Sequence, residues 1–147
     1  AHRAGVGDGR ALDDLARRHG LTYGVADYWL AKLTTALSRH DLRVYPVAWT
    51  GDAAPVYANV EWFLGGVGAR RHDTPRYTFA VLGSLTPDNG GLTRETVTAG
   101  GAARVIEQCA GYEVVVLPEG ADAVIKERFR RDPTLRAYYS RHGYALP

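Results

Sequence analysis

Residues 21–48 constrain the fold more than any other part of the sequence. Residues 21–26 form a short apolar run typical of a buried strand, and Asp27 then suits the N-cap of a helix from Tyr28 to about Arg39. Residues 42–48 alternate and are rich in β-branched and aromatic side chains, with Pro46 marking a sheet edge or a strand end. A strand, helix and second strand in this order normally give two parallel strands.

The remaining segments alternate between helical and extended patterns. Apolar residues at helical spacing predict a first helix over residues 10–19, which Gly20 ends. We further expect a helical turn over 58–64, a loop over 65–75, a strand over 76–82, a turn over 87–91, a short helix over 92–98, a strand over 112–117, and helices over 121–131 and from Asp132-Pro133 to about His142.

The segment 102–110 fits two structures. Ala102, Val105, Ile106, Cys109 and Ala110 make a helical stripe, whereas residues 104–109 also read as a strand that turns at Ala110-Gly111 into the strand that follows. We favour the second interpretation, an antiparallel hairpin.

Length and composition favour a single core. A chain of 147 residues with 46% hydrophobic residues is enough for one domain, and the lone Cys109 cannot form an internal disulfide. The predicted fold class is α/β: a single three-layer domain with a mostly parallel sheet, one C-terminal antiparallel hairpin and a helical C-terminal tail. We expect a linker over residues 1–9, the α/β domain over 10–119, and a basic helical tail over 120–147 that packs on the domain or extends from it.

Motifs for metal, phosphate or nucleophilic chemistry are weak. The five histidines are scattered without ligand spacing, and the glycine-rich runs 5–9 and 65–68 lack the strand or the helix that a phosphate loop needs. Ser38 and Ser84 lie in no nucleophile-elbow context, and no nearby charge lowers the pKa expected for Cys109. We therefore expect no metal, no cofactor and no catalytic residue in this domain.

Two polar and aromatic groups are candidate ligand sites. The first, Tyr23, Asp27, Tyr28 and Trp29, lies where the first strand meets its helix, and open α/β sheets bind ligands outside the carboxyl ends of strands. The second is Asn59, Glu61 and Trp62. Aromatic faces stack on the C–H surfaces of sugars while carboxylates and amides bond hydroxyls, so both groups suit a glycan. The simpler alternative is that Trp29 is core, Asp27 only a helix cap, and Trp62 a loop anchor.

Charge and hydropathy limit the classes of partner that this chain is expected to bind. The net charge of +2 is too small to indicate nucleic-acid binding, although residues 126–141 carry six Lys or Arg against Glu127 and Asp132. We read this basic tail as solvated charge over an apolar packing face, with a membrane-adjacent role as the second interpretation. No apolar run approaches the ~20 residues of a membrane span. The chain contains no Met, so we expect that it is processed or excised from a longer polypeptide.

An ordered set of motifs resembles a known family. Residues 20–38 contain Gly, Tyr-Trp, Thr-Thr and Ser, and residues 42–47 read Leu-Arg-Val-Tyr-Pro-Val. Glu61-Trp62-Phe63, a Phe-containing strand at 77–82 and the strand pair 104–109 and 111–116 follow. Over residues 10–117 the sequence is similar to the extracytoplasmic C-terminal domain of bacterial polytopic membrane glycosyltransferases of the protein-mannosyltransferase type. In those enzymes the catalytic acidic residue lies between early membrane helices, so the resemblance implies no catalytic residue in this chain.

The resemblance therefore implies an accessory periplasmic domain. It would be tethered to the membrane-embedded portion of its parent protein and would bind a glycan or lipid-linked sugar, without nucleic acid. Two alternatives stay open from the residues alone: a small cytosolic α/β enzyme or nucleotide-binding domain, and a structural interaction module.

Overall fold

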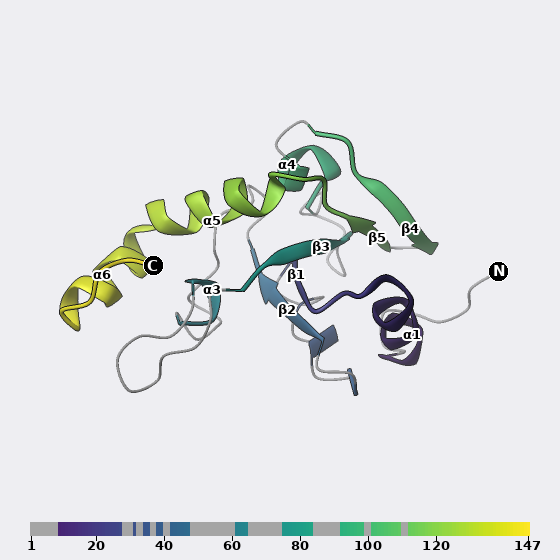
Figure 1. Cartoon of the computed structure of the whole chain (residues 1–147), viewed down its shortest axis with the longest axis horizontal. Helices are drawn as coiled ribbons and strands as arrows, with labels where there is room; N and C mark the ends of the chain where they lie inside the picture. The colour runs from purple at the N-terminus through teal and green to yellow at the C-terminus, as the bar shows by residue number, and fades with distance from the viewer. Residues whose placement is uncertain are drawn as a thin grey trace.

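The computed structural model describes residues 9–27, 31, 34–35, 38–39, 42–47, 61–64, 75–83, 92–98, 101–109 and 112–147 (Figure 1). Its elements are α1 (Gly9–His19), β1 (Tyr23–Ala26), β2 (Arg43–Pro46), α3 (Glu61–Leu64), β3 (Tyr77–Leu82), α4 (Arg94–Thr98), β4 (Arg104–Cys109), β5 (Tyr112–Val116), α5 (Ala121–Arg131) and α6 (Pro133–Arg141). Between β1 and β2 the described residues Ala31, Thr34 and Thr35 are also helical. The expected linker before Gly9, the loop over 65–74 and the turn over 87–91 lie outside the described residues.

The five strands form one open, mixed sheet in the order β2-β1-β3-β5-β4. β1 pairs with β2 and with β3 in parallel, as the strand, helix and strand pattern predicts, and β2 is an outer strand, in agreement with Pro46. The expectation of a mostly parallel sheet is not confirmed, because β5 is antiparallel to both β3 and β4. The physical reason is that the C-terminal hairpin inserts its second strand against β3, so it contributes two antiparallel ladders instead of one.

Two hydrophobic clusters cover opposite faces of this sheet and give the fold three layers. α1 and Ala31 pack with Phe79, Val81 and Val114 on one face. α3, α5 and α6 pack with other residues of the same strands on the other face, in a cluster that includes Val25, Tyr45, Phe63, Tyr77, Leu82, Val115, Ile125, Phe129 and Tyr139. Figure 1 shows the strands between α1 and α5. Ala31, between β1 and β2, and α3, between β2 and β3, therefore lie on opposite faces.

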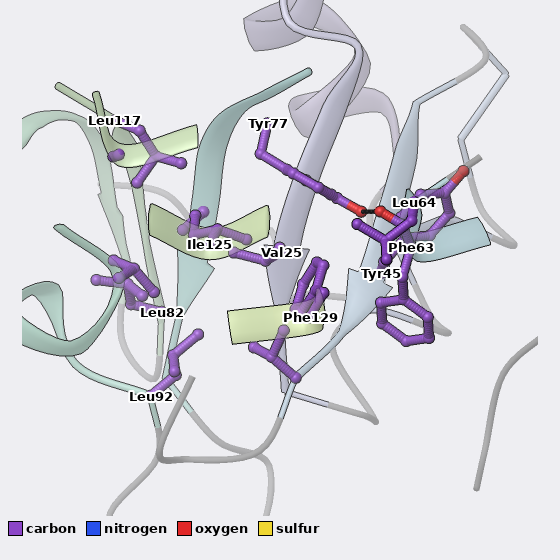
Figure 2. Close-up of a cluster of buried hydrophobic side chains, with 14 of the residues drawn as sticks. Val25, Tyr45, Phe63, Leu64, Tyr77, Leu82, Leu92, Leu117, Ile125 and Phe129 are labelled. Carbon is purple, nitrogen blue, oxygen red and sulfur yellow. Dashed lines mark hydrogen bonds between the residues drawn. The ribbon is translucent and has the colours of Figure 1, made fainter. Parts of the chain in front are cut away.

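An irregularity in β3 decides which side chains reach each face. Tyr23 pairs with Tyr77, but Gly24 pairs with Phe79, so Thr78 is an extra residue in β3. Such a bulge shifts the alternation of side chains by one position. Tyr77 consequently shares a face with Ala80 and Leu82 instead of with Phe79. In Figure 2 the Tyr77 hydroxyl donates to the carbonyl of Phe63 at 2.7 Å, which holds α3 against the sheet.

The segment over 102–110 is a strand and not a helix. β4 and β5 form a hairpin closed by the pair Cys109 and Tyr112. A second bulge lies in β4, because Val105 pairs with Val115 and Glu107 with the adjacent Val114. The extra residue breaks the period of two, which explains why this sequence also fits a helical stripe.

The C-terminal helices are part of the packed domain. Phe129, Leu135 and Tyr139 are almost completely buried against the sheet. α6 begins as its sequence predicts, with the Asp132 side chain accepting from the backbone N–H groups of Thr134 and Leu135 at 2.9 and 3.0 Å. The tail therefore packs on the domain and completes one of its two cores.

Candidate functional site

The strand order places a switch point between β1 and β3. β1 connects to β2 on one side of itself, and β2 connects back to β3 on the other side, with all three strands parallel. In open α/β sheets, ligands bind outside the carboxyl ends of the two strands where the winding direction reverses. Asp27 follows β1 at this edge and Gly83 follows β3, with a positive φ of 127° at Gly83. This carboxyl edge is the candidate site.

Asp27 joins the first strand to its helix. Its carbonyl accepts the N–H of Ala31 at 2.8 Å, which is the first helical bond, so Asp27 occupies the N-cap position that its sequence context predicts. Its side chain is half-buried. A carboxylate at the N-cap position of a helix is stabilised by the helix dipole.

A second carboxylate lies on the same row of the sheet. Ala26 pairs with Val81, so Asp27 is level with Leu82, and Leu82 in turn pairs with Glu113 of β5. Two strand spacings separate Asp27 from Glu113, which is about 10 Å between their backbones. The candidate site thus spans three adjacent strands, with β3 in the middle.

Glu113 forms a two-pronged ion pair with Arg94 at the start of α4. Arg94 Nε donates to Oε1 and Nη2 donates to Oε2, both at 2.6 Å. The hydrogen bonds from Arg94 lower the pKa of Glu113 below its usual value, and the positive charge of Arg94 adds a smaller lowering. Partial burial acts in the opposite direction. Glu113 is therefore ionised at neutral pH and does not suit a general acid. Half of the Arg94 side chain is exposed, so it presents further N–H donors at this edge.

The described part of this edge offers hydrogen-bonding groups, and no catalytic set converges there among the described residues. Two carboxylates accept from hydroxyls, and the guanidinium donates. Among the described residues no three His, Cys, Asp or Glu side chains gather as a metal site requires. The Ser38 hydroxyl donates to Asp13 Oδ1 at 2.6 Å, and Asp13 Oδ2 accepts the backbone N–H of Arg39 at 2.8 Å. The Asp13 carboxylate therefore holds α1 against the segment before β2, at the opposite edge of the sheet, and is not part of the candidate site.

The first predicted group is divided by the structure. Asp27 lies at the carboxyl edge, but Tyr23 begins β1 at the opposite edge, about 13 Å away along an extended strand. Tyr23 is partly buried, and its ring centroid lies 6.2 Å from that of Tyr45 in the core. Tyr28 and Trp29, which follow Asp27 in sequence, lie outside the described residues.

The second predicted group is only partly described. The backbone of Glu61 and Trp62 forms the first half of α3, which confirms residues 61–64 of the expected helical turn. Their side chains and residues 58–60, Asn59 included, lie outside the described residues. The next residue, Phe63, is fully buried, and its ring lies 6.1 Å from that of Tyr45. Tyr45 therefore lies between Phe63 of α3 and Tyr23 in one aromatic cluster, and Phe63 is not a member of the predicted group.

Sequence reasoning missed Arg94, Glu113 and Gly83. The available signal was Glu113, the one charged residue inside the apolar run from 112 to 117. Its place at the carboxyl edge depends on which strand of the hairpin meets β3, and the residues alone do not specify this pairing.

Comparison with family models, curated proteins and solved structures finds no match to this chain. Each helix within the described ranges is too short or too polar to cross a bilayer.

Proposed function

We propose that this domain binds a neutral or amino-bearing sugar at the carboxyl edge of β1 and β3. The observation that supports the proposal is the row formed by Asp27 and the Arg94–Glu113 pair at the switch point of the sheet. Carboxylates and a guanidinium are suitable partners for the hydroxyl groups of a sugar, and Tyr28 and Trp29 are adjacent in sequence for stacking.

The charges of the row favour this ligand class over nucleotides. Asp27 and Glu113 carry two negative charges against one positive charge on Arg94, so a phosphate would meet net repulsion. Asp27 also occupies the helix N-terminus where nucleotide phosphates bind in related architectures. The nucleotide-binding alternative consequently has the weaker support.

Calorimetric titration of the whole chain tests the proposal. The ligand panel contains neutral oligosaccharides, amino sugars and ATP. We expect binding of one of the first two classes and none of ATP. Asp27→Asn keeps a good helix cap but loses the charge, and we expect at least a several-fold weaker affinity because hydrogen bonds to charged groups are the stronger ones. Asp14→Asn, at an exposed carboxylate on α1, is the matched control.

Binding of ATP in place of sugars would contradict the proposal, as would an affinity for sugars that Asp27→Asn leaves unchanged. Circular dichroism of both variants separates loss of a ligand contact from loss of the fold.

The wider context that we propose rests on the sequence resemblance. The domain would lie on the periplasmic side, attached to the membrane-embedded portion of a glycosyltransferase-like parent, and would hold a glycan or lipid-linked acceptor near the catalytic site of that portion. The complete reading frame tests this context. A series of hydrophobic segments of about 20 residues on the N-terminal side supports it, and a start codon directly before Ala1 would contradict it.

A further inference from the structure

The outward face of α6 is basic and carries no acidic residue. The buried side chains of this helix are Leu135 and Tyr139, which lie one turn apart. Its exposed residues are small or basic: Pro133, Thr134, Arg136, Ala137, Ser140 and Arg141. The sequence from residue 133 to residue 147 contains no Asp or Glu, so no carboxylate side chain of this segment neutralises the two arginines.

An exposed aromatic ring stands at the C-terminal end of the same helix. The helix ends at Gly143, whose φ is 70° and whose N–H bonds to the carbonyl of Ser140 at 3.0 Å. The N–H of Tyr144 bonds to the carbonyl of Tyr139 at 2.9 Å. These two bonds form a Schellman motif, which fixes the chain directly after the helix. The Tyr144 side chain is nevertheless 40% exposed, so an accessible ring is held at this end of α6.

We propose that the α6 tip, formed by Arg136, Arg141 and Tyr144, contacts the surface of an anionic lipid bilayer. Figure 1 shows α6 at one end of the long axis of the molecule, away from α1 and β4. Guanidinium groups attract phosphate headgroups, and the small residues between the arginines let the helix approach the surface. A tyrosine, with an apolar ring and a polar hydroxyl, suits the headgroup level of a bilayer.

A bilayer suits this tip better than a nucleic acid. Proteins that bind nucleic acid through charge make about 6–10 phosphate contacts, whereas the net charge of this chain is only +2. Arg131, directly before α6, is already paired with Glu127 at 3.4 Å. A bilayer presents phosphates over a whole plane, so a few arginines and one ring give a weak, reversible contact. The contact goes beyond sugar binding, because it sets which end of the domain faces the bilayer.

Flotation of the whole chain with lipid vesicles at low salt tests the proposal. We expect binding to vesicles of phosphatidylcholine mixed equally with phosphatidylglycerol. Binding should be lost with pure phosphatidylcholine, and at high salt, which screens the charges. Arg136→Gln with Arg141→Gln should weaken binding by roughly 10- to 30-fold, because both headgroup contacts are lost. Lysine at the same two positions should retain most of the binding, since the attraction depends on charge.

Two exposed arginines away from the tip provide the matched control. Arg18→Gln with Arg104→Gln removes the same net charge from α1 and β4, which lie toward the other end of the molecule in Figure 1. We expect this variant to bind the anionic vesicles far more tightly than the α6 double variant. Equal weakening in the two variants would overturn the proposal, because net charge and not the tip would then attract the bilayer.

Absence of binding to the anionic vesicles at low salt would also overturn the proposal, as would binding of an oligonucleotide in their place. Circular dichroism checks the fold of each variant. The sugar affinity of the α6 double variant, measured by calorimetry, should equal that of the unaltered chain. Failure of the bilayer contact and failure of the proposed sugar site are therefore separate outcomes.

Discussion

The absence of a side chain at Gly24 makes room for the ring of Phe79. A Cβ atom at this position would lie 2.6 to 2.7 Å from three atoms of the Phe79 ring, the cross-strand partner of Gly24. Both residues lie in the middle of the sheet, and Phe79 is completely buried. We predict that Gly24→Ala lowers the free energy of unfolding by about 1–3 kcal/mol, the usual cost of overpacking, as measured by urea denaturation.

A double-variant cycle identifies the cause of this effect. Phe79→Leu alone destabilises by leaving a cavity, but it also makes room for the new methyl group. Gly24→Ala with Phe79→Leu should therefore cost less than the sum of the two changes. Strict additivity would mean that the ring is not what excludes a side chain at residue 24.

Buried tyrosines set the alkaline limit of stability. Burial, with a smaller contribution from Tyr23, raises the pKa of Tyr45 to about 12, against a lowering by Arg43. Burial also raises the pKa of Tyr77 well above its usual value. A tyrosine in the unfolded chain has a pKa of about 10. The contribution of the neutral, buried Tyr45 to folding stability is therefore complete below pH 10, and it is lost as the pH rises through about 12, where Tyr45 ionises in the folded protein.

Denaturation series in this pH range test the linkage. We expect the unfolding free energy to fall as the pH rises above 10, and Tyr45→Phe to make that fall less steep while the ring packing is retained. An equally steep decline in the variant would show that Tyr45 ionises at its ordinary pKa in the folded protein.

At the scale of elements, α5 is fastened to β3 through one carboxylate. Asp122 Oδ1 accepts the backbone N–H of Tyr77 at 2.6 Å, and Oδ2 lies 2.9 Å from Lys126 Nζ. Removal of this acceptor leaves a half-buried N–H unpaired. We predict that Asp122→Ala lowers the unfolding free energy by about 1–3 kcal/mol, and that Asp122→Asn, which retains an acceptor oxygen, costs less.

Glu127→Ala on the same helix is the control. Glu127 pairs with the partly exposed Arg130 and the exposed Arg131, and such surface pairs contribute about 0–1 kcal/mol. Equal losses in the Asp122→Ala and Glu127→Ala variants would show that the bond to β3 does not anchor α5.

The local sequence predicts whether a segment is helix or strand wherever the periodic spacing of its apolar residues is unbroken. The stripe of residues 10–19 and the Asp132-Pro133 cap each predict a helix close to its observed position. The period fails in β4, where the bulge adds a residue, and segment 102–110 consequently fits two structures. The direction of β5 beside β3 depends on long-range pairing, so no local pattern predicts the mixed sheet.

At the scale of the whole molecule, the sequence predicts part of the carboxyl edge but not its full composition. Asp27 is identifiable because a helix cap directly follows a buried strand, and parallel strands bind ligands at that end. Tyr23, only four residues earlier, belongs to the opposite edge, since extended backbone carries it about 13 Å away. Arg94 and Glu113 reach the same row only when the hairpin is placed beside β3.

Chemical-shift mapping by ¹⁵N NMR, during titration with the sugar that binds in calorimetry, tests the location of the site most directly. The proposal predicts that the amide signals of Asp27, Gly83, Arg94 and Glu113 shift together and saturate with one affinity. Shifts confined to the aromatic cluster around Tyr23 and Tyr45, with the carboxyl edge unchanged, would contradict it.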